Sequence, residues 1–275
     1  RVLFRSAAVA LLSGMACSAA FAADTPTDPE DAGNPIAANV TLVSDYRYRG
    51  ISQSNFKPAI QGGFDYAHES GFYIGNWNSS ISWISDAASA GGSKNVSAPI
   101  EMDFYAGFKK ELIGEGFASD LGVLQYYYPT SGLPSSATNP NTTEIYAAQN
   151  FTFGPVTGFV KFSYAVTNTF GYSNSSGSYY PDLTANYDTG VWGLAVNAHV
   201  GYQKIAGQNV VAGVPTASYT DWKLGLTKDF GGGLSLAAAY IGTNAAKSGS
   251  TYAYQSPSGK NLGGSTGIVS LTKTF

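Results

Sequence analysis

The chain contains little charge and very little sulfur or histidine. Only 12% of its 275 residues are Asp, Glu, Lys or Arg, and it has one cysteine and two histidines. So little charge is unusual for a helical surface, whereas 33 glycines and 19 tyrosines favour strands joined by tight turns. The formal net charge is −3 and no basic run occurs, which excludes a nucleic-acid partner on electrostatic grounds.

The single cysteine, Cys17, lies inside a predicted signal peptide over residues 1–22. Two arginines precede an apolar stretch, and an Ala-Phe-Ala cleavage site follows it. The apolar stretch is too short to cross a bilayer as a helix. The first residue is Arg and not Met, so we expect the natural start to lie upstream. Removing this segment leaves an exported chain with no thiol or disulfide and a formal net charge of −5.

Residues 23–37 are acidic and rich in proline, and they predict a flexible leader. From residue 38 to residue 275, extended segments alternate with segments rich in glycine, serine and asparagine, which predicts one all-β domain of about twelve strands. The expected strands are 39–50, 58–68, 71–84, 100–110, 117–128, 143–152, 156–170, 179–188, 191–202, 218–229, 234–245 and 264–275.

The connections between these strands alternate in length. Tight turns such as FGGG (230–233) follow every second strand. The other connections are polar loops, the longest being 85–99, 129–142, 203–217 and 246–264. An up-and-down order therefore places all long loops at one end. Transmembrane β-barrels of the outer membrane have this asymmetry, whereas soluble β-sandwiches mix their loop lengths.

Apolar and polar side chains alternate within the strands. In 218–229, Trp222 and Leu224 share one side, and Asp221 and Lys223 share the other. A closed barrel of this size has no room in its lumen for so many aromatic rings. The apolar face is therefore expected to contact lipid and the polar face to line the lumen.

Two of the expected strands, 117–128 and 143–152, alternate poorly. Gln125 and Gln149 fall on their nominally apolar faces. The register of these two strands stays open at this point.

Aromatic residues gather near strand ends, where a membrane barrel has interfacial girdles. The expected girdle residues are Tyr48, Trp77, Trp83, Phe108, Tyr164, Trp192, Tyr202 and Phe230. The last strand ends on Phe275, with Leu271 and Val269 on the same side. A terminal amphipathic strand that ends in phenylalanine is typical of outer-membrane proteins, and it predicts recognition by the barrel assembly machinery.

The stretch VTLVSDYRYRG at 40–50 combines both faces in one segment. Parity places Val40, Leu42, Tyr46 and Tyr48 toward lipid, and Asp45, Arg47 and Arg49 toward a polar lumen. Lipid offers no hydrogen-bond partner, so such a sheet must close on itself and leave no edge unpaired.

Three features resemble the TorF-type porin family of proteobacteria, formerly a conserved family of unknown function. They are SDYRYRGISQS at 44–54, PAIQGGFDYAHESGFYIG at 58–75 and the Phe-terminated end. The resemblance covers essentially the whole exported chain, although the motifs beyond residue 110 are loose. It implies an outer-membrane barrel with a channel role in a Gram-negative bacterium. It carries over no functional residues.

Charged side chains on the inward parity are the candidate pore-lining residues. They are Asp45, Arg47, Arg49, Glu101, Asp103, Glu144, Lys161, Asp221 and Lys223, with His199 as a polar neighbour. Charged rings select ions by sign and size, and Arg47 and Arg49 are the candidates for a constriction. The alternative is a salt-bridged network that fills the barrel and only stabilises it. A barrel of twelve strands lies between self-filled and open sizes, so both alternatives stay open.

Signals for catalysis and for metals are weak. A lipid hydrolase on the barrel wall would use His199 near Asn197, with Ser163 or Ser235 as the nucleophile. The chain has no histidine pair at metal-ligand spacing, and no phosphate-binding loop. We therefore expect no enzyme activity, no metal and no cofactor.

Three hypotheses follow for the function. The first is a passive outer-membrane channel for small hydrophilic solutes or ions, surrounded by outer-membrane lipid. The second is a closed barrel that acts in recognition through its long loops. The third is the lipid hydrolase centred on His199.

Overall fold

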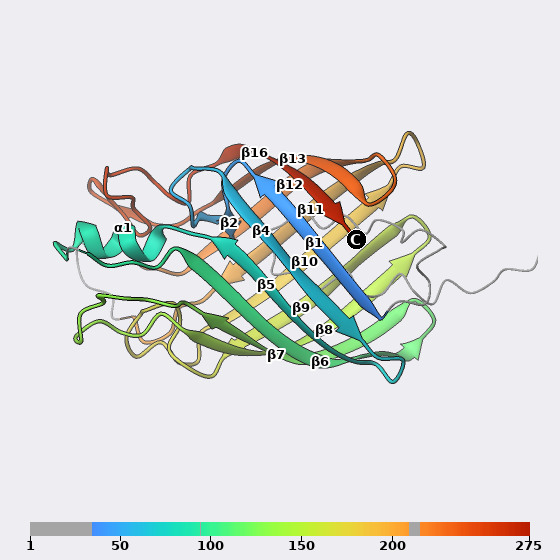
Figure 1. Cartoon of the computed structure of the whole chain (residues 1–275), viewed down its shortest axis with the longest axis horizontal. Helices are drawn as coiled ribbons and strands as arrows, with labels where there is room; N and C mark the ends of the chain where they lie inside the picture. Colours follow the sequence, from blue (N-terminus) through green and yellow to red (C-terminus); the bar gives the residue numbers. More distant parts are fainter. Residues whose placement is uncertain (1–34, 94, 209–214) are drawn as a thin grey trace, which may run out of the picture.

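A computed structural model of the chain describes residues 35–93, 95–208 and 215–275. Twelve strands form a closed antiparallel barrel (Figure 1). They are β1 (Ile36–Val43), β4 (Ala59–Ala67), β5 (Phe72–Ser80), β6 (Ile100–Gly114), β7 (Phe117–Tyr127), β8 (Thr142–Phe153), β9 (Val156–Ala165), β10 (Tyr179–Asp188), β11 (Leu194–Gln203), β12 (Tyr219–Asp229), β13 (Leu234–Thr243) and β16 (Thr266–Thr274). The twelve-stranded all-β fold expected from the sequence is confirmed.

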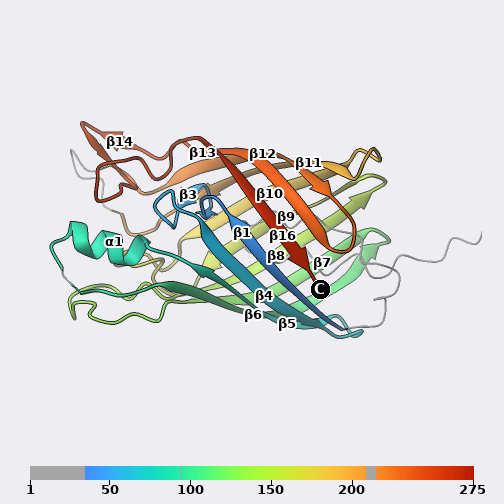
Figure 2. The same cartoon turned by 45° about the horizontal axis from the view of Figure 1, so that its top comes forward.

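The strands follow an up-and-down order in which each pairs with its neighbours in sequence. The barrel closes where β1 pairs with β16, from Asn39 opposite Thr274 to Val43 opposite Ser270. Figure 2 shows the tilted strands and this seam from a second side. The predicted signal peptide lies outside the described residues. Most of the predicted leader, residues 23–37, also lies outside the described residues. Its last two residues belong to β1, which begins at Ile36.

The two ends of the barrel differ as the loop lengths predict. Tight turns and the C-terminus lie at one end, and every long connection lies at the other (Figure 1). The long loops carry short elements: the hairpins β2 (Arg47–Tyr48) with β3 (Ile51–Ser52) and β14 (Lys247–Ser248) with β15 (Thr251–Tyr252), and helix α1 (Trp83–Ala90). Among the described residues, no helix is long and apolar enough to cross a membrane.

Helix α1 lies where the sequence predicted a strand end and a loop. Its sequence WISDAASA is rich in alanine, and the Ser82 hydroxyl donates to the Asp86 carboxylate in the first turn at 2.7 Å. Gly91 follows its last residue. The alanine content was the signal that the loop prediction overlooked.

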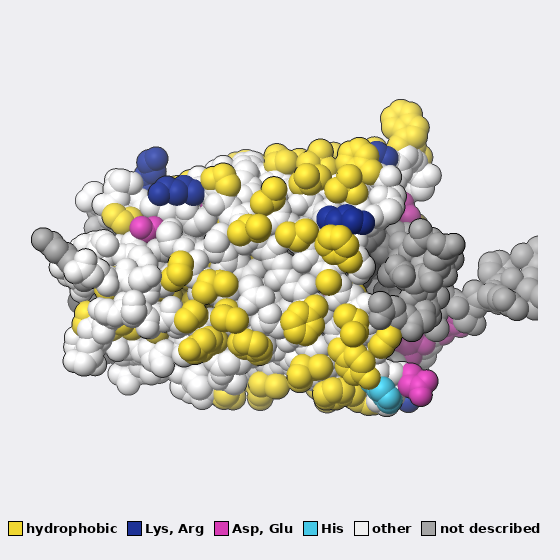
Figure 3. Space-filling view, viewed as in Figure 1, with side chains coloured by type: hydrophobic (Ala, Val, Ile, Leu, Met, Phe, Trp, Pro, Cys, Tyr) yellow, Lys and Arg dark blue, Asp and Glu magenta, His cyan; other side chains and the backbone are white. Residues whose placement is uncertain are grey.

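On the barrel wall, apolar side chains point outward and polar side chains point inward, as predicted. In β12, Leu224 is 61% exposed, whereas Asp221 is 1% exposed and points inward. Apolar side chains spread over the outer surface between the two ends (Figure 3). The outward face therefore presents an apolar band, as a barrel surrounded by lipid requires.

Gln125 and Gln149, whose strands had an open register, both point outward and pair across neighbouring strands. Gln125 accepts a hydrogen bond from Thr143 at 2.6 Å, and Gln149 accepts one from Ser119 at 2.8 Å. The first pair lies near the long loops and the second near the short turns. Each amide is hydrogen-bonded to a hydroxyl of the neighbouring strand close to one end of the wall, which makes polar groups tolerable on this face.

The expected aromatic girdle is correct in part. Phe108, Tyr164, Trp192, Tyr202 and Phe230 are outward and exposed. Tyr48 and Trp77 are instead buried inside the barrel, and Trp83 belongs to α1 and packs edge-on against Tyr128. For Tyr48 and Trp83 the chain turns away from the expected strand, whereas Trp77 stays within β5 and lies on its inward side.

The stretch at 40–50 shows this turn most clearly. Val40 and Leu42 point outward as predicted, but β1 ends at Val43. Tyr46 and Tyr48 are buried in the lumen, so their predicted contact with lipid is wrong. Asp45, Arg47 and Arg49 also lie inside, since the whole segment folds into the barrel.

Candidate functional site

Residues 45–56 fold into the lumen at the long-loop end, and we call this segment the plug. Its hairpin turns at Arg49 and Gly50, whose φ angles of +45° and +78° are left-handed. A side chain at Gly50 would collide with Asp221 and Thr243 of the wall, so the plug backbone lies directly against the barrel. Asp45 to Ser54 are all buried.

Arg47 attaches the plug to the loop between β13 and β16. Its Nη1 donates to the carbonyl oxygens of Leu262 at 2.8 Å and Gly264 at 3.1 Å. Its Nε lies 2.6 Å from the carboxylate of Asp45, which also accepts from the Ser52 hydroxyl at 2.6 Å. The charge of Arg47 is therefore compensated inside the plug.

Arg49 connects the plug to the barrel wall. Its Nη1 and Nη2 donate to the two carboxylate oxygens of Glu144 on β8, at 3.1 and 2.8 Å. Nη1 also donates to Gln203 on β11, and the guanidinium carbon lies 4.0 Å from the ring centroid of Tyr180 on β10. A planar bidentate pair of this kind is geometrically specific, so Arg49 holds the plug in one position.

A third attachment involves a carboxylate with tyrosine partners. The hydroxyls of Tyr46 in the plug and of Tyr128, which follows β7, both donate to Glu101 of β6, the latter at 2.8 Å. Tyr46 packs edge-on against Trp77 at 5.6 Å between ring centroids. Glu101 and its neighbour on the inward parity, Asp103, are fully buried.

His199 on β11 belongs to a polar cluster in the lumen. Its Nε2 lies 2.9 Å from both the Tyr180 hydroxyl and an Asp221 carboxylate oxygen. Its Nδ1 lies 2.9 Å from the Thr184 hydroxyl. The hydrogen bonds described for His199 thus use no serine, and Ser163 and Ser235 are not brought to it.

Outside the plug, the strands themselves carry the inward charges. Asp120 lies opposite Lys109 in the sheet, and Lys161 lies opposite Asp182. The Lys161 ammonium is 4.3 Å from the ring centroid of Tyr146. Lys223 alternates with Asp221 on the inward side of β12.

Tyrosines that lie flat along the inner wall also fill the lumen. Tyr73 pairs with Gly107, and Tyr146 with Gly122, and a Cβ on either glycine would collide with the tyrosine ring. Sequence reasoning missed these tyrosines because it followed charge and not ring size. Glycines on the inward parity were the signal that could have found them.

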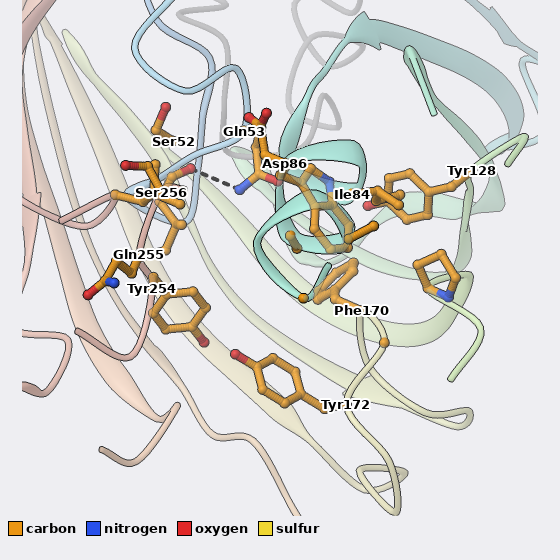
Figure 4. A pocket seen from close by; sticks show the side chains of 18 of the residues that line it. Ser52, Gln53, Ile84, Asp86, Tyr128, Phe170, Tyr172, Tyr254, Gln255 and Ser256 are labelled. Carbon is orange, nitrogen blue, oxygen red and sulfur yellow. Dashed lines mark hydrogen bonds between the residues drawn. The ribbon is translucent and has the colours of Figure 1, made fainter. Parts of the chain in front are cut away.

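A vestibule opens above the plug, between α1 and the long loops. It is a cavity of about 440 Å³ whose lining includes Gln53, Trp83, Tyr128, Phe170, Tyr172 and Tyr254. Figure 4 shows the phenol groups of Tyr172 and Tyr254 directed toward each other across it. Burial raises the pKa of both phenols, so both stay neutral donors.

All ten residues predicted to line a pore lie inside the barrel. Three reach it through the plug, and the others point inward from strands. The structure brings Arg49 to Glu144, and His199 to Asp221. The pairing partners Gln203, Tyr180 and Tyr128 were not predicted. Within the described part of the chain, no group of three His, Cys, Asp or Glu side chains is placed to hold a metal.

The family of the chain follows from its sequence. Residues 27–275 match the family model described as "Bacterial protein of unknown function (Gcw_chp)". The chain belongs to this family. No curated protein matches it.

Solved structures similar to this Gcw_chp chain are outer-membrane barrels. The KdgM porin is 7% identical, with a TM-score of 0.51 over 87% of this chain and 99% of that one. The KdgM porin in complex with disordered oligogalacturonate is 8% identical, with a TM-score of 0.50 over 87% and 98%. An outer membrane channel from Pseudomonas putida F1 is 14% identical, with a TM-score of 0.49 over 91% and 99%. At this identity the likeness to the KdgM porin shows a shared barrel fold alone.

Proposed function

We propose that this Gcw_chp protein is a porin-like channel of the outer membrane that passes small hydrophilic solutes or ions. The observation that carries the proposal is a barrel with an apolar outer face and a lumen lined by charged and polar groups. The plug, held by Arg49 and Glu144, is the constriction that sets its conductance. The fold shared with the KdgM porin supports this proposal.

The charges that face the lumen favour cations. Among the described residues, the inward carboxylates are Asp45, Asp65, Glu101, Asp103, Asp120, Glu144, Asp182 and Asp221, and the inward bases are Arg47, Arg49, Lys109, Lys161 and Lys223. Both arginines are paired with a carboxylate. An excess of acid along a narrow pore lowers the energy of a cation more than that of an anion.

Planar-bilayer recordings of the purified protein test the proposal. We expect discrete conductance steps and a reversal potential that shows cation preference in a salt gradient. The Arg47→Ala and Arg49→Ala variants should both strengthen that preference, because each leaves a carboxylate uncompensated. Silent bilayers with folded protein would overturn the channel proposal.

A closed barrel that acts in recognition is the second candidate, and the buried plug favours it. Arg47, Tyr46 and Glu101 are fully buried, so the plug packs closely inside the lumen at this level. In that case bilayers stay silent and deletion of the long loops changes binding at the cell surface.

A lipid hydrolase receives less support. His199 points into the lumen, away from the lipid-facing wall, and its partners are a tyrosine, a threonine and an aspartate. A serine nucleophile within reach of the base is the element that this mechanism requires. Hydrolysis of dispersed phospholipid that disappears in His199→Ala would reverse this ranking.

We also propose that the protein contacts outer-membrane lipid along its apolar band and enters the membrane through its terminal strand. Phe275 follows β16 and is exposed, while its backbone exchanges hydrogen bonds with Ala38. Its free ring is suited to recognition by the barrel assembly machinery. Removal of Phe275 should reduce the amount of heat-modifiable, folded barrel in outer-membrane fractions.

A further inference from the structure

The vestibule has the construction of a small-molecule site. Its volume of about 440 Å³ lies within the range of about 300–1,000 Å³ that is usual for such sites. The plug, α1 and the loops after β7, β9 and β13 all contribute to its wall. Segments far apart in the sequence therefore converge on one cavity at the long-loop end (Figure 4).

The charged residues in the wall of the vestibule limit which class of ligand can bind there. Asp86 is the one charged residue among the described residues that line the cavity. Anions find no basic partner there, and a metal ion would find one carboxylate, which already accepts from Ser82. The cavity therefore suits an uncharged compound.

The wall combines aromatic rings with amide and hydroxyl groups. Trp83, Phe170 and Tyr254 supply ring surface, and Gln53 and Gln255 supply amides. A wholly apolar ligand would take water from these polar groups without replacing its hydrogen bonds, which is unfavourable. A ring with apolar faces and a polar edge satisfies both kinds of surface.

One donor in the wall lacks an acceptor. The indole Nε1 of Trp83 is buried and has no hydrogen-bond partner among the described residues. Buried donors are nearly always paired, so an unpaired one requires an explanation. A ligand oxygen at this position would supply the missing acceptor.

Two residues of the cavity wall have strained backbone angles. Asn55 and Phe170 have positive φ angles of +53° and +46°. Such angles are unfavourable for bulky residues and cluster at ligand-binding sites. The strain indicates that the vestibule is held in a particular shape.

We propose that the vestibule is a binding site for an uncharged sugar, with the sugar ring against Trp83 and Tyr254 and its hydroxyls bonded to the amides and to the Trp83 indole. A sugar ring has C–H faces and a hydroxyl edge, which matches this wall. Binding here does not depend on conduction through the barrel, so the two proposals succeed or fail separately.

The test is titration calorimetry of the full exported chain with glucose, galactose, maltose and sucrose. The detergent must be an amine oxide, because alkyl glycoside detergents would compete for the site. We expect at least one of these sugars to bind with a Kd on the order of millimolar or lower. Trp83→Ala and Tyr254→Ala should weaken binding about ten-fold or more, and Trp83→Phe, which keeps a ring but removes the donor, should weaken it less.

Trp192→Ala is the matched control, since this tryptophan is exposed at the opposite end of the barrel. Each variant must first show the heat-modifiable gel shift of a folded barrel. The proposal is overturned if no sugar of the panel binds at up to about 50 mM. It is equally overturned if the cavity variants bind as the parent does, or if glucuronate or choline binds more tightly than every neutral sugar.

Discussion

The two halves of the lumen are built from different kinds of structure. Toward the long loops, the blocking groups belong to the plug, which is an inserted segment held by Arg47 and Arg49. Toward the short turns, the charges of Lys109 and Asp120 belong to the strands themselves. A plug can be removed while the wall stays intact, whereas wall charges can only be exchanged one by one. The contributions of the plug and of the wall charges to passage through the barrel can therefore be tested separately.

The comparison predicts that removing the plug opens the barrel. Replacing residues 45–56 by a four-residue Gly/Ser/Asn linker leaves β1 and β4 as a hairpin, because the two strands are already paired neighbours. We expect single-channel conductance to rise about three-fold or more, since the constriction is gone. Shortening the exposed tip at Gly249 and Ser250 is the control and should leave conductance unchanged. Equal conductance in both variants would show that the plug does not limit passage.

The two plug arginines are predicted to contribute differently to the free energy of unfolding. Arg49→Ala leaves Glu144 buried without its partner, which costs about 3–5 kcal/mol of the free energy of unfolding. Arg47→Ala should cost less, about 1–2 kcal/mol, because Asp45 keeps its bond from Ser52. Denaturant unfolding in micelles measures both values. Adding Glu144→Gln to Arg49→Ala should recover part of the loss, and an additive double variant would contradict the pairing.

The stability of the barrel wall is predicted to depend on its lipid-facing side chains and not on the plug. Leu224→Arg places a charge near the middle of β12 on the exposed face, and we expect a loss of about 2–4 kcal/mol. Trp192→Arg, in a turn and 82% exposed, should cost no more than about 1 kcal/mol. Refolding into lipid vesicles with denaturant titration measures the difference. Equal losses at the two positions would contradict the prediction that Leu224 lies deeper in the bilayer than Trp192.

The smallest effect is expected for a single charge of the wall. Lys161→Met removes one of five inward bases without disturbing the plug, so the cation-to-anion permeability ratio should rise about two-fold. Lys57→Met, in an exposed loop position, should leave the ratio unchanged. Reversal potentials in a salt gradient distinguish the two results. A change in conductance without a change in the ratio would assign Lys161 to the constriction.

The wall of the barrel could be predicted from the sequence because lipid and lumen impose opposite demands on alternate residues. Trp222 and Asp221, or Phe104 and Asp103, satisfy those demands with nearest neighbours in the chain. Tight turns and long loops then settle the up-and-down order. These features are local, and local patterns are visible in a sequence.

The plug could not be predicted because its sequence also alternates. SDYRYRG has the period of a strand, so parity extended β1 through Tyr48 and assigned two buried tyrosines to lipid. Arg49 and Gly50 mark the left-handed turn, but only Gly50 is a residue type that signals one. The partners Glu144 and Gln203 lie 95 and 154 residues away, and no spacing rule connects such positions. The wall of the vestibule could not be predicted for the same reason, because it comes from segments far apart in the sequence.

The barrel can close only after β16 has formed its pairing with β1. The Thr41 and Thr272 hydroxyls, 231 positions apart, meet across this seam at 2.8 Å. Contacts of such long sequence separation form late and slowly. Until synthesis and export deliver the final strand, both outermost strands expose unpaired backbone that invites aggregation. A loss of even a few C-terminal residues would therefore have two effects. It would prevent the barrel from closing, and it would leave an intermediate that is prone to aggregation.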